Sequence, residues 1–314
     1  MNEKNSFWKI PIVFFITRLF ILGGMVLIFG SVAYSIAVLT IPTLFNLDIN
    51  TNPTLLSQFN NPTVIYALKY IQVCSSIGMF ILPAWHFGKA LNKIPQNYLS
   101  LNKAPDYKEA ITASAALLIY LPFIAWLAYA NEKIQMPPMF QQWEAALKAT
   151  EELTGKLTQT FLKAENLRDL GVNLFVIAIL PAISEELFFR GALQNFIKLV
   201  SKNKHLAVWI TAVVFSAIHG QFYGFIPRLI LGAVLGYVYV YSGSIWIPII
   251  MHFVNNGFAV VCSYTPFKEK LPLFLQDGYV FEEWYINTGS AILGSLLIFV
   301  IYLLSRKRIL YNGE

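Results

Sequence analysis

The chain has 314 residues, of which 56% are hydrophobic and only 13% are charged, and its mean hydropathy is +0.56. Soluble domains carry about 25% charged residues, so this composition excludes an ordinary soluble domain and predicts a protein that crosses a membrane several times. The net charge of +6 is not gathered into basic stretches interleaved with aromatic residues, so the sequence does not indicate nucleic-acid binding.

Apolar stretches recur along the whole chain. A spanning helix needs about 20 predominantly apolar residues, and this length predicts about eight spans, of which the fifth and sixth are short. The first is too long for the core of a cleaved signal peptide and is expected to be retained. We therefore expect an all-α, polytopic membrane bundle that forms a single integral membrane domain over residues 1–314. The spans fall at about residues 10–40, 63–90, 109–130, 168–198, 205–220, 225–242, 244–263 and 286–305.

Lysine and arginine residues lie in alternate connections between these spans. They gather before the first span (Lys4 and Lys9), in the loops at 88–108 and 198–204, and after the last span at 306–308. Eight spans place all four segments on the same side, and the positive-inside rule makes that side cytoplasmic. We therefore expect both termini in the cytoplasm.

The longest loop, at residues 131–167, differs from the others because its apolar residues recur at helical spacing. This pattern predicts an amphipathic helix that lies on the outer surface of the membrane. An exposed linker without a membrane role is the alternative interpretation.

The fourth span contains three ionisable residues within the stretch SEELFFRG at 184–191. Hydrocarbon cannot solvate such groups, so each one marks a candidate functional site. Glu186 and Arg190 are four residues apart, about 40° around an α-helix, which predicts an ion pair. Glu185 lies about 100° from Glu186 and is expected to face other helices.

Polar residues that Glu185 could meet lie in two later spans. His219 follows Phe215 by one helical turn, and His252 precedes Asn256 by one turn. Each histidine alone is equally compatible with a hydrogen-bonded packing role. Together, however, a carboxylate, two imidazoles and an amide from three helices are expected to converge inside the bundle, because lipid is the costly alternative.

These residue types support two kinds of chemistry. A glutamate can accept a proton from water as a general base, while a histidine positions that water or ligates a metal. His252 and Asn256 can then donate hydrogen bonds to the oxyanion of a tetrahedral intermediate. Proton or ion translocation uses the same residue types within membranes, so both hypotheses stay open at this point. The zinc-protease motif HExxH is absent from the sequence.

The order of the motifs adds a resemblance. EExxxR, FxxxH and HxxxN follow one another between residues 185 and 256, and the sequence resembles the CAAX protease and bacteriocin-processing family of intramembrane proteases, which are related to the Ras-converting CAAX endopeptidase. The family core corresponds to residues 168–263, and residues 1–167 add only a compatible hydropathy. The motif residues are Glu185, Glu186, Arg190, Phe215, His219, His252 and Asn256.

The resemblance implies a helical bundle with a polar, water-accessible cavity inside the membrane. It implies that Glu185 and His219 activate the catalytic water, and that His252 and Asn256 bind the oxyanion. Supporting roles are implied for Glu186, Arg190 and Phe215.

The resemblance leaves the mechanism and the biological role open. Zinc held by Glu185, His219 and His252 and a metal-free glutamate mechanism are both compatible with the motifs. The expected partners are the lipid bilayer and a peptide or membrane-protein substrate. No feature marks a eukaryotic origin or a prenylated substrate, so we expect a bacterial cytoplasmic membrane, where members of the family serve bacteriocin maturation and immunity.

Two alternatives to an endopeptidase remain. One is a non-proteolytic immunity or scaffold protein of the same fold. The other is a transporter, which would line further spans with polar residues; the few candidates are Arg18, Lys69 and Arg228.

Overall fold

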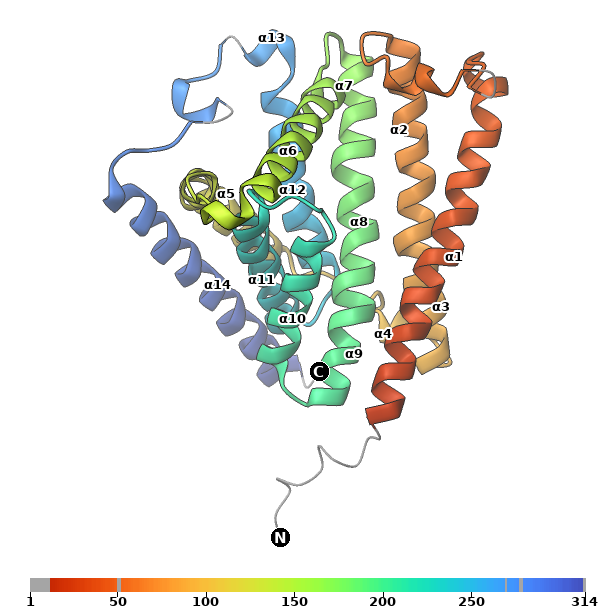
Figure 1. The fold of residues 1–314 in the computed structure, drawn as a ribbon. Helices are drawn as coiled ribbons and strands as arrows, with labels where there is room; N and C mark the ends of the chain where they lie inside the picture. The colour runs from red at the N-terminus through yellow and green to blue at the C-terminus, as the bar shows by residue number, and fades with distance from the viewer. Residues whose placement is uncertain (1–11, 50–51, 269, 277–278, 313–314) are drawn as a thin grey trace. The chain divides into compact units, whose positions relative to one another are not determined.

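The computed structural model describes residues 12–49, 52–268, 270–276 and 279–312, and helices make up most of them (Figure 1). Among these residues no β-strand is formed, although an isolated parallel bridge joins Ala164 and Tyr264. The all-α class predicted from the sequence is confirmed. Lys4 and Lys9, on which the predicted orientation partly depends, lie outside the described residues.

Apolar helical segments lie at each of the predicted positions. Among the described residues, six helices are long and apolar enough to cross a membrane, which confirms a polytopic membrane protein. Two further apolar helices, Lys204–Ala217 and Trp246–Cys262, have only 14 and 17 residues. The count of eight spans therefore stays a prediction. The six long helices are Ile12–Phe45, Pro62–Leu91, Tyr107–Glu132, Leu167–Ser201, Phe225–Ser242 and Trp284–Arg308.

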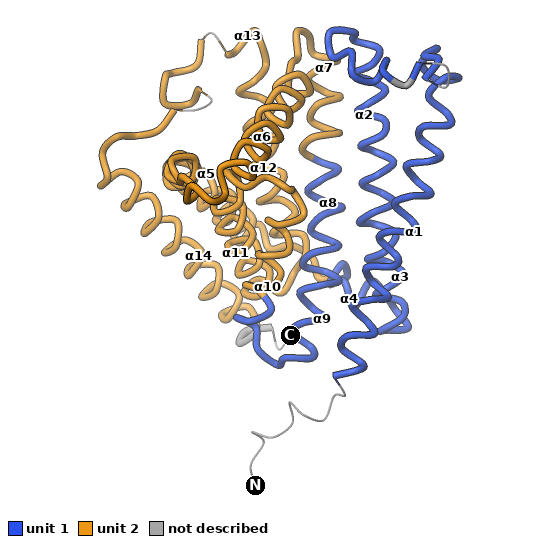
Figure 2. Tube along the Cα trace, viewed as in Figure 1, with its two compact units in different colours: residues 1–102, 179–207 blue, residues 103–178, 208–314 orange. Residues whose placement is uncertain are grey.

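The chain divides into two compact units (Figure 2). Unit 1 comprises Met1–Asn102 and Ile179–Ala207, and unit 2 comprises Lys103–Ala178 and Val208–Glu314. The boundary falls inside the helix Leu167–Ser201. A single domain over residues 1–314 stays a prediction.

Unit 1 is built around two long spans that pack closely. In the second span, the α-helix is interrupted by the wide π-turns of η4, where Gly78 faces α1. A Cβ atom added to Gly78 would lie 2.6 Å from the Phe29 carbonyl oxygen and would also collide with the Ala33 side chain. The helices of unit 1 are α1 (Ile12–Phe45), η3 (Pro53–Ser57), α2 (Pro62–Ser76), η4 (Ile77–Ile81), α3 (Leu82–Leu91), α4 (Pro95–Tyr98), α8 (Leu180–Glu186), η7 (Leu187–Gln194) and α9 (Asn195–Ser201).

Unit 2 has its core where α5, α11, α12 and α14 meet. Leu117, Leu235, Met251 and Ile301, one from each helix, are almost fully buried in one apolar cluster. The helices that lie wholly or largely in unit 2 are α5 (Tyr107–Glu132), η5 (Pro138–Phe140), α6 (Gln141–Leu162), α7 (Leu167–Asn173), η6 (Leu174–Ile179), α10 (Lys204–Ala217), α11 (Phe225–Ser242), α12 (Trp246–Cys262), α13 (Thr265–Lys268), η8 (Leu273–Leu275) and α14 (Trp284–Asn312).

An ion pair joins the ends of three helices in unit 2. Arg308 of α14 lies 3.3 Å from the buried Glu109 carboxylate of α5, measured from Nη1 to Oε1. The same guanidinium donates from Nη2 to the Ser242 carbonyl at the end of α11, over 2.8 Å. Because Glu109 is only 1% exposed, its charge depends on this contact for compensation.

The predicted helix in the loop at 131–167 is present as α6, which has 22 residues (Figure 1). None of its residues is fully buried, and large apolar side chains remain exposed, with Trp143 at 72% and Leu153 at 53%. A helix that covers part of a protein while exposing apolar side chains is typical of a membrane surface. That location stays a prediction.

We predict that Gly78→Ala destabilises unit 1 by about 1–3 kcal/mol, because the added methyl group meets backbone that cannot move without separating the two helices. Thermal unfolding of the purified protein in detergent measures the effect. Gly23→Ala in α1 is the matched control, since nothing lies within 4 Å of its added Cβ. The control is expected to leave stability unchanged or to raise it, and an unchanged melting temperature in Gly78→Ala would contradict the packing described.

Candidate active site

Glu186 and Arg190 form a fully buried ion pair in unit 1. Arg190 Nη1 donates to Glu186 Oε1 over 2.7 Å, and both side chains are 0% exposed. The predicted pairing is therefore confirmed. The helix itself differs from the regular α-helix assumed, because α8 passes into the wide π-turns of η7 directly after Glu186. Side chains four residues apart still meet on these turns.

Apolar and aromatic groups of unit 1 surround the segment that carries this pair. Phe80 of η4 approaches Phe188 and Phe189, with ring centroids 5.6 and 6.0 Å apart. On the cytoplasmic side predicted from the sequence, Tyr98 donates its hydroxyl to the Ala192 carbonyl over 3.1 Å. Because both side chains are buried, removal of one charge would leave the other without its ion-pair partner in a poorly solvated place.

Glu185, the predicted general base, precedes the ion pair by one residue and is half-buried. It belongs to unit 1, whereas His219, His252 and Asn256 belong to unit 2. The convergence of Glu185 with these three residues therefore stays a prediction.

Phe215 brings the two histidines of unit 2 together. Its ring centroid lies 5.1 Å from that of His219 and 6.3 Å from that of His252, in edge-to-face arrangements. Phe215 and His252 are buried, at 3% and 4% exposed, while the His219 side chain is exposed. The motifs FxxxH and HxxxN thus meet at the Phe215 ring, which contacts both His219, after α10, and His252 of α12.

The orientation of His219 follows from the way in which α10 ends. The predicted span runs to residue 220, but the helix ends at Ala217, and the His219 N–H bonds to the Ser216 carbonyl. The Phe215 carbonyl instead lies 2.7 Å from His219 Nδ1. A carbonyl oxygen only accepts, so Nδ1 carries the hydrogen and the neutral ring has its lone pair at Nε2. His219 is therefore held as a base or ligand through Nε2.

Asn256 is oriented by an irregularity in another helix. In a regular helix the Ile177 carbonyl would accept from the N–H of residue 181, but that residue is Pro181, which has none. Asn256 Nδ2 donates to this carbonyl over 3.0 Å, within the wide turns of η6. The side-chain oxygen of Asn256 accepts from Asn255 Nδ2, also over 3.0 Å. Both ends of the amide are thus fixed, and one N–H of Nδ2 remains for another acceptor.

Zinc held by Glu185, His219 and His252 requires ligands from both units. Within each unit, no group of three or more His, Cys, Asp or Glu among the described residues is placed to hold a metal ion. The zinc site stays a prediction that elemental analysis of the purified protein would test.

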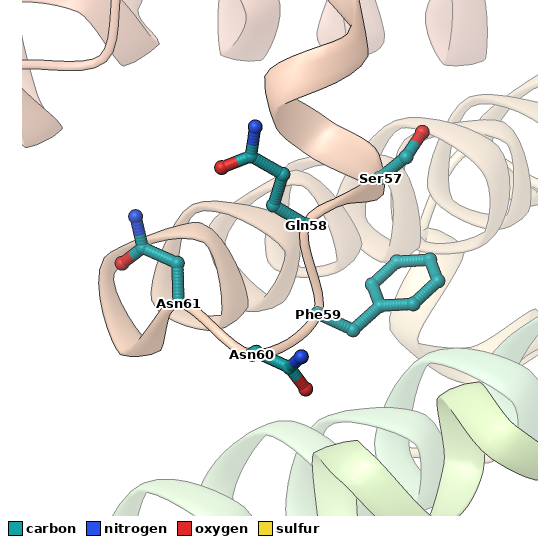
Figure 3. Close-up of a pocket in the computed structure, with 5 residues that line it drawn as sticks. All are labelled: Ser57, Gln58, Phe59, Asn60 and Asn61. Atoms are coloured by element: carbon teal, nitrogen blue, oxygen red, sulfur yellow. The ribbon is translucent and has the colours of Figure 1, made fainter.

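A pocket of about 520 Å³ is found elsewhere, in unit 1, along five consecutive residues that begin at the end of η3 (Figure 3). It is lined by Ser57–Asn61, none of which is titratable, and it contains none of the predicted site residues. This pocket is not a candidate active site, and the predicted intramembrane cavity stays a prediction.

The sequence motifs missed the loop that follows His219. Gln221 is bonded on one side to Arg228 and on the other to Glu151, over 2.6 and 3.0 Å. Arg228 was the one sign of this network in the sequence, because it is an ionisable residue in a predicted span. The residues linked to it, Gln221 and Glu151, lie in a loop and in α6. Polar residues are common in such segments, so these two did not stand out.

We predict that Glu186→Gln lowers stability by about 3–5 kcal/mol, because it leaves Arg190 charged and buried. The double variant Glu186→Leu/Arg190→Leu is expected to be less destabilised than Glu186→Gln, because it removes both charges of the buried ion pair. Thermal unfolding in detergent compares the variants. Glu165→Gln is the control, since its ion pair with Lys163 is 2.7 Å long but more than 60% exposed on both sides, at 64% and 68%, and no measurable change is expected. A wild-type melting temperature in Glu186→Gln would refute the argument.

Comparison with known proteins bears on the same segment of the chain. Residues 168–258 match the model of the family described as Type II CAAX prenyl endopeptidase Rce1-like. The uncharacterized protein YpbD of Bacillus subtilis (strain 168) is 27% identical over 89 residues, which make up 27% of this chain and 42% of YpbD. The chain thus matches less than half of that relative's length. No solved structure matches the chain. Over residues 168–258 the protein resembles the Rce1-like type II CAAX prenyl endopeptidases, and the resemblance inferred from the motifs is confirmed.

Proposed function

We propose that the protein is an intramembrane endopeptidase that hydrolyses a peptide bond of a membrane-associated peptide or protein. The observation that carries the proposal is the meeting of His219 and His252 at Phe215, with the Nδ1 of His219 bonded to a backbone carbonyl. A fixed tautomer and a defined open nitrogen are what a water-activating histidine needs. The family match over residues 168–258 supports the same chemistry.

In the proposed reaction, Glu185 and His219 both act on the attacking water. His219 Nε2 accepts one hydrogen bond from the water and orients it, and Glu185 accepts its proton as the water oxygen attacks the scissile carbonyl. The C–O bond formed gives a tetrahedral intermediate with one negatively charged oxygen. Glu185 then returns the proton to the leaving nitrogen as the C–N bond breaks.

The oxyanion is assigned to His252 and Asn256. His252 is buried, and Asn256 has one N–H of its amide held by the Ile177 carbonyl. Because that bond fixes the plane of the amide, its second N–H has a defined direction before the substrate arrives. Donors fixed in advance stabilise developing charge without the cost of reorganisation.

We predict that Glu185→Gln abolishes cleavage, because an amide cannot accept the proton from water. Membrane proteins from cells with wild-type protein or the variant would be compared by mass spectrometry of their termini. The wild type is expected to generate termini that are absent with Glu185→Gln, and these termini identify the substrates. Identical termini in the two samples, at equal protein levels, would refute the proposal and favour the non-proteolytic scaffold.

We predict that His219→Gln lowers kcat by about 10²-fold, the usual cost of misplacing a reacting group, because the side chain that orients the water is lost. The measurement uses purified protein in nanodiscs with a substrate peptide identified from the termini. His86→Gln is the matched control, since His86 makes the same kind of contact, 2.8 Å from Nδ1 to the Leu82 carbonyl one turn before it. Equal losses in the two variants would show a structural effect and not a catalytic one.

A further inference from the structure

The loop between α10 and α11 contains the proposed catalytic histidine. The residue after it, Gly220, has φ of +64°, in the left-handed region that favours glycine. Glycine restricts the backbone little, so the conformation of the loop must be set by contacts of its neighbours.

The far end of the loop is held by two buried side chains. Asn131, at the end of α5 and 3% exposed, donates from Nδ2 to the Phe222 carbonyl over 3.0 Å and to the Tyr223 carbonyl. Ser216 donates its hydroxyl to the Phe225 carbonyl over 2.6 Å. These contacts fix residues 222–225, but they do not reach the residues next to His219.

Gln221 supplies the anchor close to His219. Its side-chain oxygen accepts from Arg228 Nη1 over 2.6 Å, and its side-chain nitrogen donates to Glu151 Oε1 over 3.0 Å. Arg228 is itself held by a bond of 3.2 Å from Nε to the Gly224 carbonyl. An amide has an acceptor end and a donor end, so it satisfies a cation on one side and a carboxylate on the other.

The carboxylate that accepts from Gln221 belongs to Glu151 of the amphipathic helix α6. Glu151 lies on the half-buried face of α6 together with Leu147 and Thr154, while Trp143 and Leu153 on the outer side are exposed. Helix α6 thus contacts the loop through the carboxyl group of Glu151. Charge-assisted hydrogen bonds are about twice as strong as neutral ones.

We propose that Gln221 is a positioning residue for His219, and that Glu151 and Arg228 hold it in place. The inference rests on the proposed function, since it assigns α6 a part in the same active site. Gln221 is separated from His219 by Gly220 alone, so the bonds at its two ends limit how far the imidazole can shift. A misplacement of about 1 Å at a reacting group can cost about 10²-fold in rate.

The direction of these hydrogen bonds, from Arg228 to Gln221 and from Gln221 to Glu151, provides a test. Gln221→Glu keeps an acceptor for Arg228 but turns a second carboxylate toward Glu151, so the two repel each other. Glu151→Gln keeps an acceptor for the Gln221 amide. In the double variant, the carboxylate at position 221 accepts from Arg228 and from the new amide at position 151. Both hydrogen bonds therefore form again, but the donor between positions 151 and 221 is now at position 151.

We expect Gln221→Glu to lower kcat about 10-fold or more with little change in KM, within the range known for misplaced catalytic groups. Glu151→Gln is expected to lower kcat less than Gln221→Glu does, because its amide still accepts from Gln221, and the double variant is expected to recover most of the loss. Gln142→Glu, the same change at an exposed residue of α6, is the control and should leave kcat unchanged. A double variant as slow as Gln221→Glu would overturn the inference.

A second measurement does not depend on cleavage. The imidazole resonance of His219, assigned by its loss in His219→Gln, is recorded by NMR in nanodiscs that contain labelled histidine. Gln221→Glu is expected to shift or broaden it, and the double variant is expected to restore it. An unchanged resonance in Gln221→Glu overturns the inference even in a protein that cleaves peptides. If the His219 resonance responds to Gln221→Glu but the wild-type protein shows no peptidase activity, the proposed function is refuted, while the positioning of His219 by Gln221 is supported.

Discussion

Hydrocarbon offers no hydrogen bonds, so every polar group that this protein places in its spans must be satisfied by the protein itself. The ion pair of Glu186 and Arg190 is the clearest result of this constraint, since both side chains are completely buried and lie 2.7 Å apart. Their mutual compensation lets the helix carry a third ionisable residue, Glu185, without an excess of charge around it. Glu186 and Arg190, which are costly to bury, thus stabilise as a pair the segment in which Glu185 is proposed to act.

Much of the architecture could be predicted from the sequence because a membrane imposes strong patterns. Apolar runs of sufficient length marked the helices, and ionisable residues within such a run marked Glu186 and Arg190 and their spacing. Phe215 and His219 were recognisable as a pair one turn apart, as were His252 and Asn256. That the first pair would meet His252 followed from the cost of leaving polar groups in lipid, and the ring contacts in unit 2 agree with it.

The remainder depended on features that a periodic pattern does not contain. The wide turns of η4, η6 and η7 were not predicted, and the regular α-helix assumed for residues 187–194 was wrong. The end of α10 at Ala217 depends on the turn that follows it. The partners of Gln221 could not be predicted, because it joins a loop to α6 and α11. Which residue of α6 faces that loop depends on the rotation of the helix about its axis.

The orientation of two site residues has a common physical origin. A carbonyl one turn before His219, that of Phe215, lacks its usual helical donor because the His219 N–H bonds to Ser216 instead. The Ile177 carbonyl cannot accept from residue 181, its donor in a regular α-helix, because that residue is a proline. In each case a side chain of the proposed site supplies the missing hydrogen bond, the ring of His219 in one and the amide of Asn256 in the other. Since an unsatisfied carbonyl is costly away from water, these side chains are held where the backbone needs a donor, and their remaining polar atoms acquire fixed directions before any substrate binds.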